Sequence, residues 1–256
     1  MSWERQIHIK SPAELEVMRE AGRINATVLA TVKELLQPGV TTADLNAAAE
    51  DVLRKHGCIS PFKGYGHPPF PASITVSVNQ ELVHGVPKKK RKLKAGDIVS
   101  IDCGTVFNGF VGDSAFTAGV GEISPHAQEL LDVTEGALQV AIEKMRPGNR
   151  TGDIGAAVQQ YVESRGFYVT REYTGHGVGR QMHEGPQVPN YGVAGRGLPL
   201  RPGMTIALEP MVLAGTFATR VLSDQWTVVS ADGSLTAHFE HSVAVTEGDP
   251  LVLTVL

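Results

Sequence analysis

Two long stretches of the chain show the spacing of apolar residues that an amphipathic helix produces. The first runs from Ser11 to about Leu36 and opens with a capping box and a proline at the first helical position, although Gly22 weakens it midway. The second runs from Ser124 to about Met145. Both stretches predict helices that pack one face on a core.

A shorter segment repeats after each of these helices. Residues 38–48 reappear as residues 147–157, with proline, glycine, threonine, aspartate and alanine at matching positions. Each copy has a threonine cap, an acid in the first turn, an alanine-rich face and a glycine stop, and so predicts a second helix. The repeat indicates two similar halves, about residues 11–120 and 121–250, within one domain of residues 1–256.

Each pair of helices precedes strands that carry carboxylates. Leu93–Asp102 and Leu200–Glu209 both combine a basic turn, a glycine and alternating apolar residues, and each strand is expected to end on its acid. A further strand in each half carries Asp113 or Glu240. The sequence therefore predicts an α/β (α+β) protein in which each half supplies two acids from strands.

These four acids admit two interpretations. They could face solvent after an old duplication, but acids are disfavoured in strands, and these stand beside aliphatic residues that should be buried. Four unpaired buried carboxylates would be very costly, and a shared cation removes that cost. A twofold arrangement that brings all four acids to one centre therefore predicts a metal site.

The glycine-rich segment around His176 supplies a fifth donor. Glycines on both sides let the backbone pass close to another group and leave the imidazole free. A lone histidine is more often structural than a ligand, but here a second one, His183, follows, and four strand acids accompany it. Four carboxylates and one imidazole suit two divalent cations, with Mn, Fe, Co or Zn favoured.

Composition narrows the class of protein. The 256 residues are 42% hydrophobic and 20% charged, as in globular domains, and apolar runs are too short to span a bilayer. No apolar stretch follows Met1–Arg5, which argues against a secretory signal. Cys58 and Cys103 cannot build a disulfide framework or a four-thiolate zinc site. The net charge of -4 gives no general affinity for DNA or anionic membranes, so a cytoplasmic enzyme or binding domain is expected.

Seven motifs carry a family resemblance that extends over almost the whole chain. They are His84–Pro87, Asp97–Asp102, Tyr173–His183, Gln187–Tyr191, Ala207–Met211, Asp224–Thr227 and Phe239–His241. With them the sequence closely resembles the type I methionine aminopeptidases, which have the pita-bread fold. The resemblance implies two pseudo-symmetric halves around a central antiparallel sheet with flanking helices. It also implies removal of the initiator methionine from nascent chains when the second residue is small.

The same resemblance implies roles for individual residues. Asp113 and Glu240 would bridge two metal ions, and a metal-activated water would attack the first peptide bond. Glu209 would accept the proton of that water, and His183 would stabilise the developing oxyanion. His84 would contact the scissile amide nitrogen and help protonate the leaving amine. The full ligand set implied is Asp102, Asp113, His176, Glu209 and Glu240.

The implied methionine pocket is less sharply defined. Trp226 and Phe70 would form its wall, although a tryptophan is more often a core residue, and His84 without the resemblance reads as a packed strand-end histidine. Thr75 stands where many family members have a cysteine. A short insertion within residues 64–70 leaves open whether Tyr65 or His67 fills one pocket position.

The basic run from Lys88 to Lys94 matches a nuclear-localisation or nucleic-acid pattern. Short basic runs often match by chance, and a solvated turn is the simpler interpretation. Transient contact with ribosomal RNA phosphates is an intermediate one, because the family acts on nascent chains. The family also implies a monomer.

Three alternatives agree less well with the sequence. A proline-specific pita-bread peptidase usually has an added N-terminal domain, for which the residues before Ser11 leave no room. A catalytically inactive pita-bread binding module usually loses metal ligands, and all five are present here. A type II enzyme would have a long insertion in its second half.

Overall fold

The computed structural model describes residues 7–256. The prediction about a secretory signal concerns Met1–Arg5, which lie outside the described residues. The helices are α1 (Pro12–Glu34), α2 (Thr42–Lys55), α3 (Pro125–Glu143) and α4 (Thr151–Glu163). The strands of the first half are β1 (Thr75–Val78), β2 (Glu81–Val83), β3 (Ile98–Phe107) and β4 (Phe110–Gly119). Those of the second half are β5 (Tyr168–Val169), β6 (Thr174–Gly177), β7 (Glu184–Pro189), β8 (Thr205–Leu208), β9 (Met211–Leu213), β10 (Thr219–Val221), β11 (Val228–Ser230), β12 (Thr236–His238), β13 (Glu240–Ala244) and β14 (Leu251–Val252).

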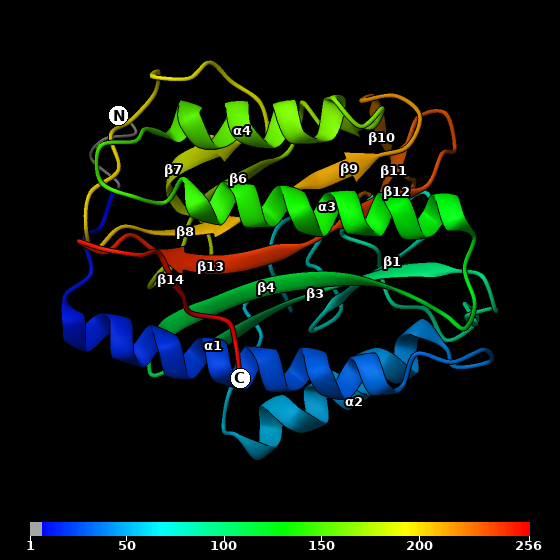
Figure 1. The fold of residues 1–256 in the computed structure, drawn as a ribbon. Coiled ribbons are helices and arrows are strands. Elements are labelled where there is room, and N and C mark those ends of the chain that lie inside the picture. Colours follow the sequence, from blue (N-terminus) through cyan, green and yellow to red (C-terminus); the bar gives the residue numbers. More distant parts are fainter. Residues whose placement is uncertain (1–6) are drawn as a thin grey trace.

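One large sheet joins the two halves. Its strand order is β1-β3-β4-β13-β8-β6-β7, with β14 paired to β13, and every pairing in it is antiparallel. The first three strands come from the first half and the others from the second, so the halves meet where β4 pairs with β13. The four helices lie on one face of this sheet, α1 and α2 across one half and α3 and α4 across the other (Figure 1). The predicted arrangement of flanking helices on a central antiparallel sheet is confirmed.

The long helices begin where the sequence predicts. Ser11 caps α1 through the backbone N–H of Glu14, whose side chain returns to the Ser11 N–H, and Ser124 caps α3. Gly22 does not interrupt α1. A side chain there would collide with the backbone of Leu253, so the glycine allows the C-terminal segment to pack against the helix.

The predicted threonine cap is correct for only one of the two shorter helices. Thr41 caps α2, but α4 is capped at Arg150, and Thr151 is its first helical residue. The Thr151 hydroxyl accepts a hydrogen bond from the N–H of Leu198 instead, while the Asp153 carboxylate accepts from the N–H of Arg150. The connection between β7 and β8, which contains Leu198, therefore uses the hydroxyl that the repeat suggests as a cap.

The prediction that the strand ends on Asp102 is wrong. Strand β3 continues from Ile98 to Phe107 and pairs with β4 along its whole length. The two strands meet at a two-residue turn, Asn108 and Gly109, where both residues have positive φ, as the tight turn of a twisted hairpin requires. Asp102 is thus a mid-strand residue, held by neighbours on both sides.

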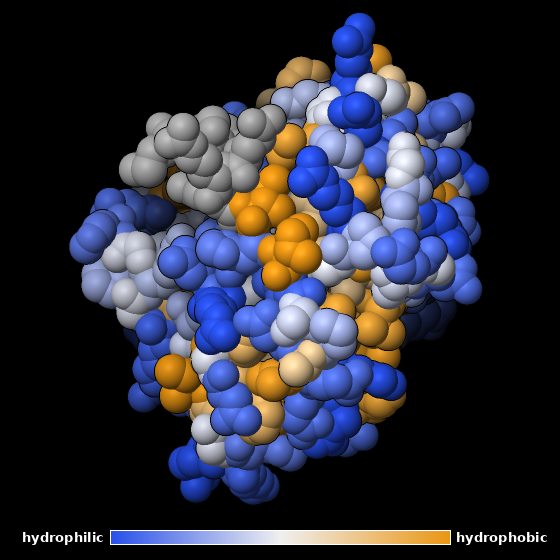
Figure 2. Space-filling view, turned by 90° about the vertical axis from the view of Figure 1, so that its left-hand side faces the viewer, coloured by the Kyte–Doolittle hydropathy of each residue, from blue (hydrophilic) through white to orange (hydrophobic). Residues whose placement is uncertain are grey.

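The apolar core fills the space between helices and sheet. One cluster packs α1 and α2 on β1 and β3 and includes Ile24, Leu45 and Ile101. A second packs α3 and α4 on the strands of the other half and includes Leu138 and Ile154. The side of the molecule turned to the viewer in Figure 2 is mainly hydrophilic, with apolar side chains in small groups between polar ones. Across residues 7–256, none of the helices has the length and apolar character needed to cross a bilayer.

Candidate metal centre

A cavity of about 510 Å³ opens on the face of the sheet away from the helices. Ile101 and Cys103 belong to the core beneath α1 and α2, and side chains alternate along a strand, so Asp102 points to the opposite face. All the site residues proposed from the sequence line this cavity: Tyr65, Phe70, Thr75, His84, Asp102, Asp113, His176, His183, Glu209, Trp226 and Glu240.

Strand register brings the acids together. Asp102 on β3 is paired with Ala115 on β4, and Ala115 is paired in turn with Glu240 on β13. Residues paired in this way share a face, so the small Ala115 side chain leaves space between the two acids. Asp113 lies two residues before Ala115 and therefore on the same face. Glu209 directly follows β8, the next strand of the sheet.

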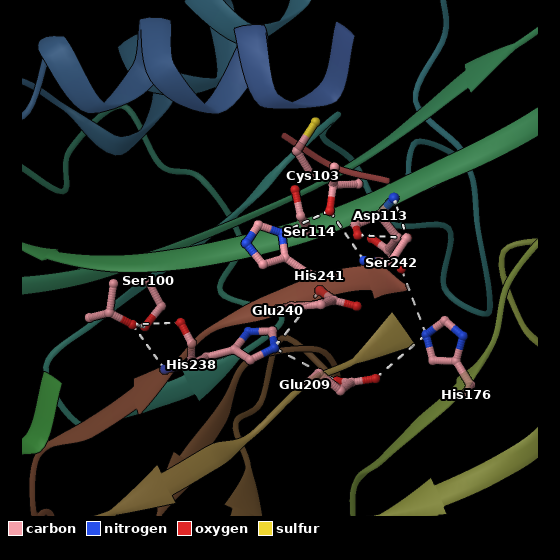
Figure 3. A network of polar contacts seen from close by, with 12 residues as sticks. Ser100, Cys103, Asp113, Ser114, His176, Glu209, His238, Glu240, His241 and Ser242 are labelled. Carbon is pink, nitrogen blue, oxygen red and sulfur yellow. Dashed lines mark hydrogen bonds and ion pairs between the residues drawn. The ribbon is translucent and has the colours of Figure 1, made fainter. Parts of the chain in front are cut away.

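The side chains of this cluster lie within a few ångströms of one another. Ligand atoms of Asp113, His176 and Glu240 are all within 4.8 Å of each other. The Nε2 atom of His176 is 3.7 Å from Asp113 Oδ2 and 3.5 Å from Glu209 Oε1. In Figure 3 its imidazole lies between those two carboxylates. Acids from β4, β8 and β13 thus converge with a histidine from β6.

The buried acids lack the partners that buried charges require. Asp113 is 1% exposed, and neither of its carboxylate oxygens has a hydrogen-bond partner among residues 7–256. Within the same range, Oδ1 of Asp102 also has none. Native proteins pair buried carboxylates or bind a cation with them. The donor set fits divalent metal ions, because a cation supplies the charge and the ligand bonds that these oxygens lack.

Burial also shifts the pKa values of these groups. It raises the pKa of Asp102 to about 8. Burial and the nearby charge of Asp102 raise the pKa of Asp113 well above its usual range. Burial and the charges of neighbouring acids do the same for Glu209 and Glu240. Such shifts arise where like charges are gathered in a dry site, and a bound cation reverses them.

His176 is oriented for ligation by its own backbone. Its Nδ1–H donates to the carbonyl of Gly177 over 2.9 Å, because a carbonyl can only accept. Burial, together with His183, lowers its pKa to about 3, so the ring is neutral and Nε2 carries a free lone pair. That lone pair faces the carboxyl groups of Asp113 and Glu209, so a cation bound among the three groups would be coordinated by all of them.

His183 and His84 line the same cavity, but neither belongs to the group whose ligand atoms lie within 4.8 Å of one another. The His183 ring packs against that of His176 with centroids 4.4 Å apart, and its Nδ1 is 2.9 Å from the Tyr65 hydroxyl. His84 directly follows β2 with φ of 59°, a left-handed conformation. Its ring meets the edge of Trp226 at a centroid distance of 6.3 Å. Burial and His183 lower the pKa of His84 to about 4.

The structure distinguishes between Tyr65 and His67, the two candidates for one pocket position. Tyr65 lines the cavity, whereas His67 is not among its lining residues. Trp226 is held against this segment by a hydrogen bond from Nε1 to the carbonyl of Pro68, and it packs edge-on against Phe70. Thr75 opens β1 directly opposite Asp102. Aromatic walls therefore stand next to the carboxylate cluster.

Several lining residues were not singled out from the sequence. His238 was not singled out either, although it is not a lining residue. It is 2% exposed, and its Nε2 atom, which has no hydrogen-bond partner in the described chain, lies 3.8 Å from Glu209 and 3.9 Å from Glu240. Its position two residues before Glu240 is a signal that strand alternation could have given. The lining residues that were not singled out are Phe62, Tyr173, Thr174, Met182, Glu184, Gln187 and Met211.

Comparisons with known proteins agree with this site. Residues 16–247 match the model of metallopeptidase family M24. A methionine aminopeptidase of Clostridium acetobutylicum is 50% identical over 248 residues, which cover 97% of this chain and 98% of that one. Methionine aminopeptidase 1 of Bacillus subtilis is also 50% identical, over 96% of this chain and 98% of that one.

Solved structures agree as well. The crystal structure of a methionine aminopeptidase from Thermotoga maritima matches 98% of this chain and 100% of its own with a TM-score of 0.95 and 45% identity. A prolidase from Pyrococcus furiosus matches 99% of this chain and 67% of its own with a TM-score of 0.79 and 21% identity, a likeness of fold alone. Both similarities define the pita-bread fold.

The chain belongs to metallopeptidase family M24, a class of metal-dependent hydrolases. Within that family its full-length relatives are methionine aminopeptidases, and the resemblance to the type I enzymes noted in the sequence is confirmed.

Proposed function

We propose that this protein removes the N-terminal methionine from nascent proteins and peptides whose second residue is small. The observation that carries the proposal is the convergence of Asp113, His176 and Glu240 within 4.8 Å in a cavity with aromatic walls. Methionine aminopeptidase is also the printed name of relatives 45–50% identical over nearly the whole chain.

The metal requirement follows from the family, and we infer the details from the donor set. Four carboxylates carry more negative charge than one divalent ion neutralises, so the site suits two ions, held by Asp102, Asp113, His176, Glu209 and Glu240. Co, Mn, Fe and Zn all accept such a set. When bound, divalent ions lower the pKa of a water molecule so that it can attack a peptide carbonyl near neutral pH.

The protein's own groups would handle protons and charge. Glu209 follows β8 at the cavity wall and would accept the proton that the attacking water loses. A neutral His183 that accepts from Tyr65 at Nδ1 carries its proton on Nε2, where it can stabilise the oxyanion of the substrate carbonyl. His84, neutral at pH 7 because of its lowered pKa, would contact the scissile nitrogen.

The methionine side chain would lie against the aromatic wall. Phe70 and Trp226 meet edge to face at 5.2 Å, and Tyr65 borders the same cavity. A thioether packs favourably against aromatic ring edges, which suits methionine better than a branched or charged side chain. Thr75 adds a small polar surface beside Asp102.

We infer that the chain works as one cytoplasmic catalytic domain and as a monomer. A single sheet built from both halves supports the single domain. The basic run is exposed from Lys88 to Lys92, with the apolar Leu93 buried beside it, which is consistent with a solvated turn and leaves the cations free for transient contact with the ribosome. Lys88 also pairs with Asp224 at 3.2 Å.

One assay separates this function from its competitors. Methionine release from Met-Ala-Ser, restored by Mn or Co after chelation, is the expected result. Cleavage of Ala-Pro peptides instead would indicate a proline-specific peptidase of the same fold. A protein that binds both ions and cleaves neither peptide would be the inactive binding module.

A further inference from the structure

A buried ion pair stands beside the candidate active site but has no part in the chemistry described above. The Nζ atom of Lys10 lies 2.6 Å from Oε2 of Glu184, and both side chains are less than 5% exposed. The two residues are 174 positions apart in the sequence. Lys10 immediately precedes the cap of α1, and Glu184 immediately follows His183.

Both partners are themselves fixed. The Lys10 ammonium also donates to the carbonyl of His8 at 3.0 Å, and the backbone N–H of Lys10 donates to Gly203 at 2.8 Å. The second carboxylate oxygen of Glu184 accepts the backbone N–H of Gln181 at 3.1 Å. One carboxylate oxygen of Glu184 therefore binds Lys10, and the other binds the backbone of the preceding loop.

The loop that ends in His183 is folded around this pair. A Cβ atom at Gly179 would lie 2.6 Å from the Lys10 ammonium and 2.7 Å from Glu184, so the backbone can pass only because position 179 has no side chain. The carbonyl of Gly179 accepts the N–H of Val111 at 2.8 Å, which fixes the same end of the loop to β4. Residues 179–184 thus form a short loop that packs against the buried Lys10–Glu184 pair.

We propose that the Lys10–Glu184 pair is a positioning device for His183, which it holds against His176 and Tyr65 in the orientation needed during turnover. This inference rests on the function proposed for His183. His183 contacts those two rings through its side chain, but the direction in which it leaves the backbone is set by the neighbouring Glu184.

Energetics agree with a positioning role better than with a stabilising one. A buried ion pair often contributes little net stability, because desolvation of the two charges offsets their attraction. Removing one partner is costly, since the other charge stays buried and must find water or move. Glu184 without Lys10 would therefore turn toward the cavity that it already lines, and would carry the loop with it.

The test is a double-mutant cycle between Lys10→Met and His183→Ala in the metal-loaded full-length protein. Lys10→Met should lower kcat about 10- to 100-fold with little change in KM or metal content, as expected for a misplaced catalytic group. In the His183→Ala background the same change should have almost no effect on kcat, because the residue it positions is already absent.

A matched control lies on the same loop. Arg180 forms an ion pair with Glu14 at 3.1 Å, close to the start of α1, but its side chain is 65% exposed. Arg180→Gln should leave kcat unchanged. If Lys10→Met does not fold, the double variant Lys10→Met with Glu184→Gln replaces it, because this variant leaves no unpaired buried charge. Its loss of kcat should likewise vanish in the His183→Ala background.

Three results would overturn the inference. Wild-type kcat in both Lys10 variants, with His183→Ala impaired, would refute the positioning role and leave the proposed function intact. An equal loss of kcat with and without His183 would show that the pair acts elsewhere. An active His183→Ala enzyme would refute the role proposed for His183, and the inference with it.

Discussion

The side chain of Ser242 bonds both backbone groups of Asp113. Its hydroxyl donates to the Asp113 carbonyl at 2.9 Å and accepts from the Asp113 N–H at 3.1 Å. Backbone pairing between β4 and β13 covers only two residue pairs, and Asp113 lies just beyond them. A side chain of the second half therefore fixes the backbone of a proposed metal ligand of the first half.

Ser242→Ala should consequently weaken metal binding. The Asp113 backbone loses the bonds that orient its carboxylate, and the loss of such supporting bonds typically costs 10- to 100-fold in metal affinity. Titration calorimetry with Mn²⁺ or Zn²⁺ measures the change. Ser230→Ala is the matched control. Ser230 is also a buried strand serine, but it lies in β11 of another sheet and its hydroxyl donates to the carbonyl of Ser234. Equal affinities in the two variants would contradict the prediction.

Glu240→Ala should reduce turnover by at least ~10²-fold with loss of one ion. Glu240 lies beside Asp113 in the cluster, and its removal leaves a bridging position empty. Metal analysis and kcat on a Met-Ala-Ser peptide check both parts. Full activity in this variant would be incompatible with a site that holds two ions.

The three cavity histidines should respond differently to replacement by alanine. His176→Ala removes the only imidazole of the proposed ligand set and should lower metal affinity. His84→Ala and His183→Ala should keep both ions and lower kcat roughly 10²–10³-fold, the usual effect of losing one transition-state donor. If His84 is only a packed strand-end residue, its variant will instead show a lower Tm with nearly unchanged kcat. Metal content, Tm and kcat of the three variants decide between these roles.

Second-residue size should control the rate of cleavage. We expect efficient release of methionine before Ala, Gly, Ser or Thr and poor release before Lys, Arg or Leu, because the resemblance to the type I methionine aminopeptidases implies a narrow site for the second residue. Rates on Met-Ala-Ser and Met-Lys-Ser peptides measure the preference. Equal kcat/KM values for the two would contradict it.

The metal-free protein should lose stability as pH rises from about 6.5 to about 8. Unfolded aspartates lose their protons near pH ~4, whereas burial keeps Asp102 protonated up to about pH 8 in the folded chain. The folded state binds more protons in this interval, so stability falls as pH rises. Below about pH 6.5 the buried histidines, whose pKa values are lowered, oppose this trend.

The Tm of chelator-treated protein at pH 6.5 and at pH 8 tests this expectation. Added divalent metal should abolish the difference, because a cation favours the ionised acids. If the Tm of the metal-free protein instead rises between pH 6.5 and pH 8, the prediction is wrong, because other groups must then outweigh the buried acids.

The sequence predicts what depends on local pattern and on short motifs. The capping box at Ser11 fixes the start of a helix within a few residues, and the carboxylates stand out because strands rarely contain them. The extent of the strand around Asp102 was missed, since it depends on pairing with β4 through a turn beyond the motif. The Lys10–Glu184 pair has no local signal, because its partners meet only after the whole chain has folded.

The proposed metal ligands are divided between the two halves, and this division has a consequence for the maturation of the protein. Asp102 and Asp113 come from the first half, while His176, Glu209 and Glu240 come from the second. Neither half alone offers the complete proposed set, so a newly made chain would gain its ions only when both halves have folded and β4 has paired with β13. Metal uptake would then be the last step of maturation, and a partly synthesised chain would be unable to remove methionine from other chains.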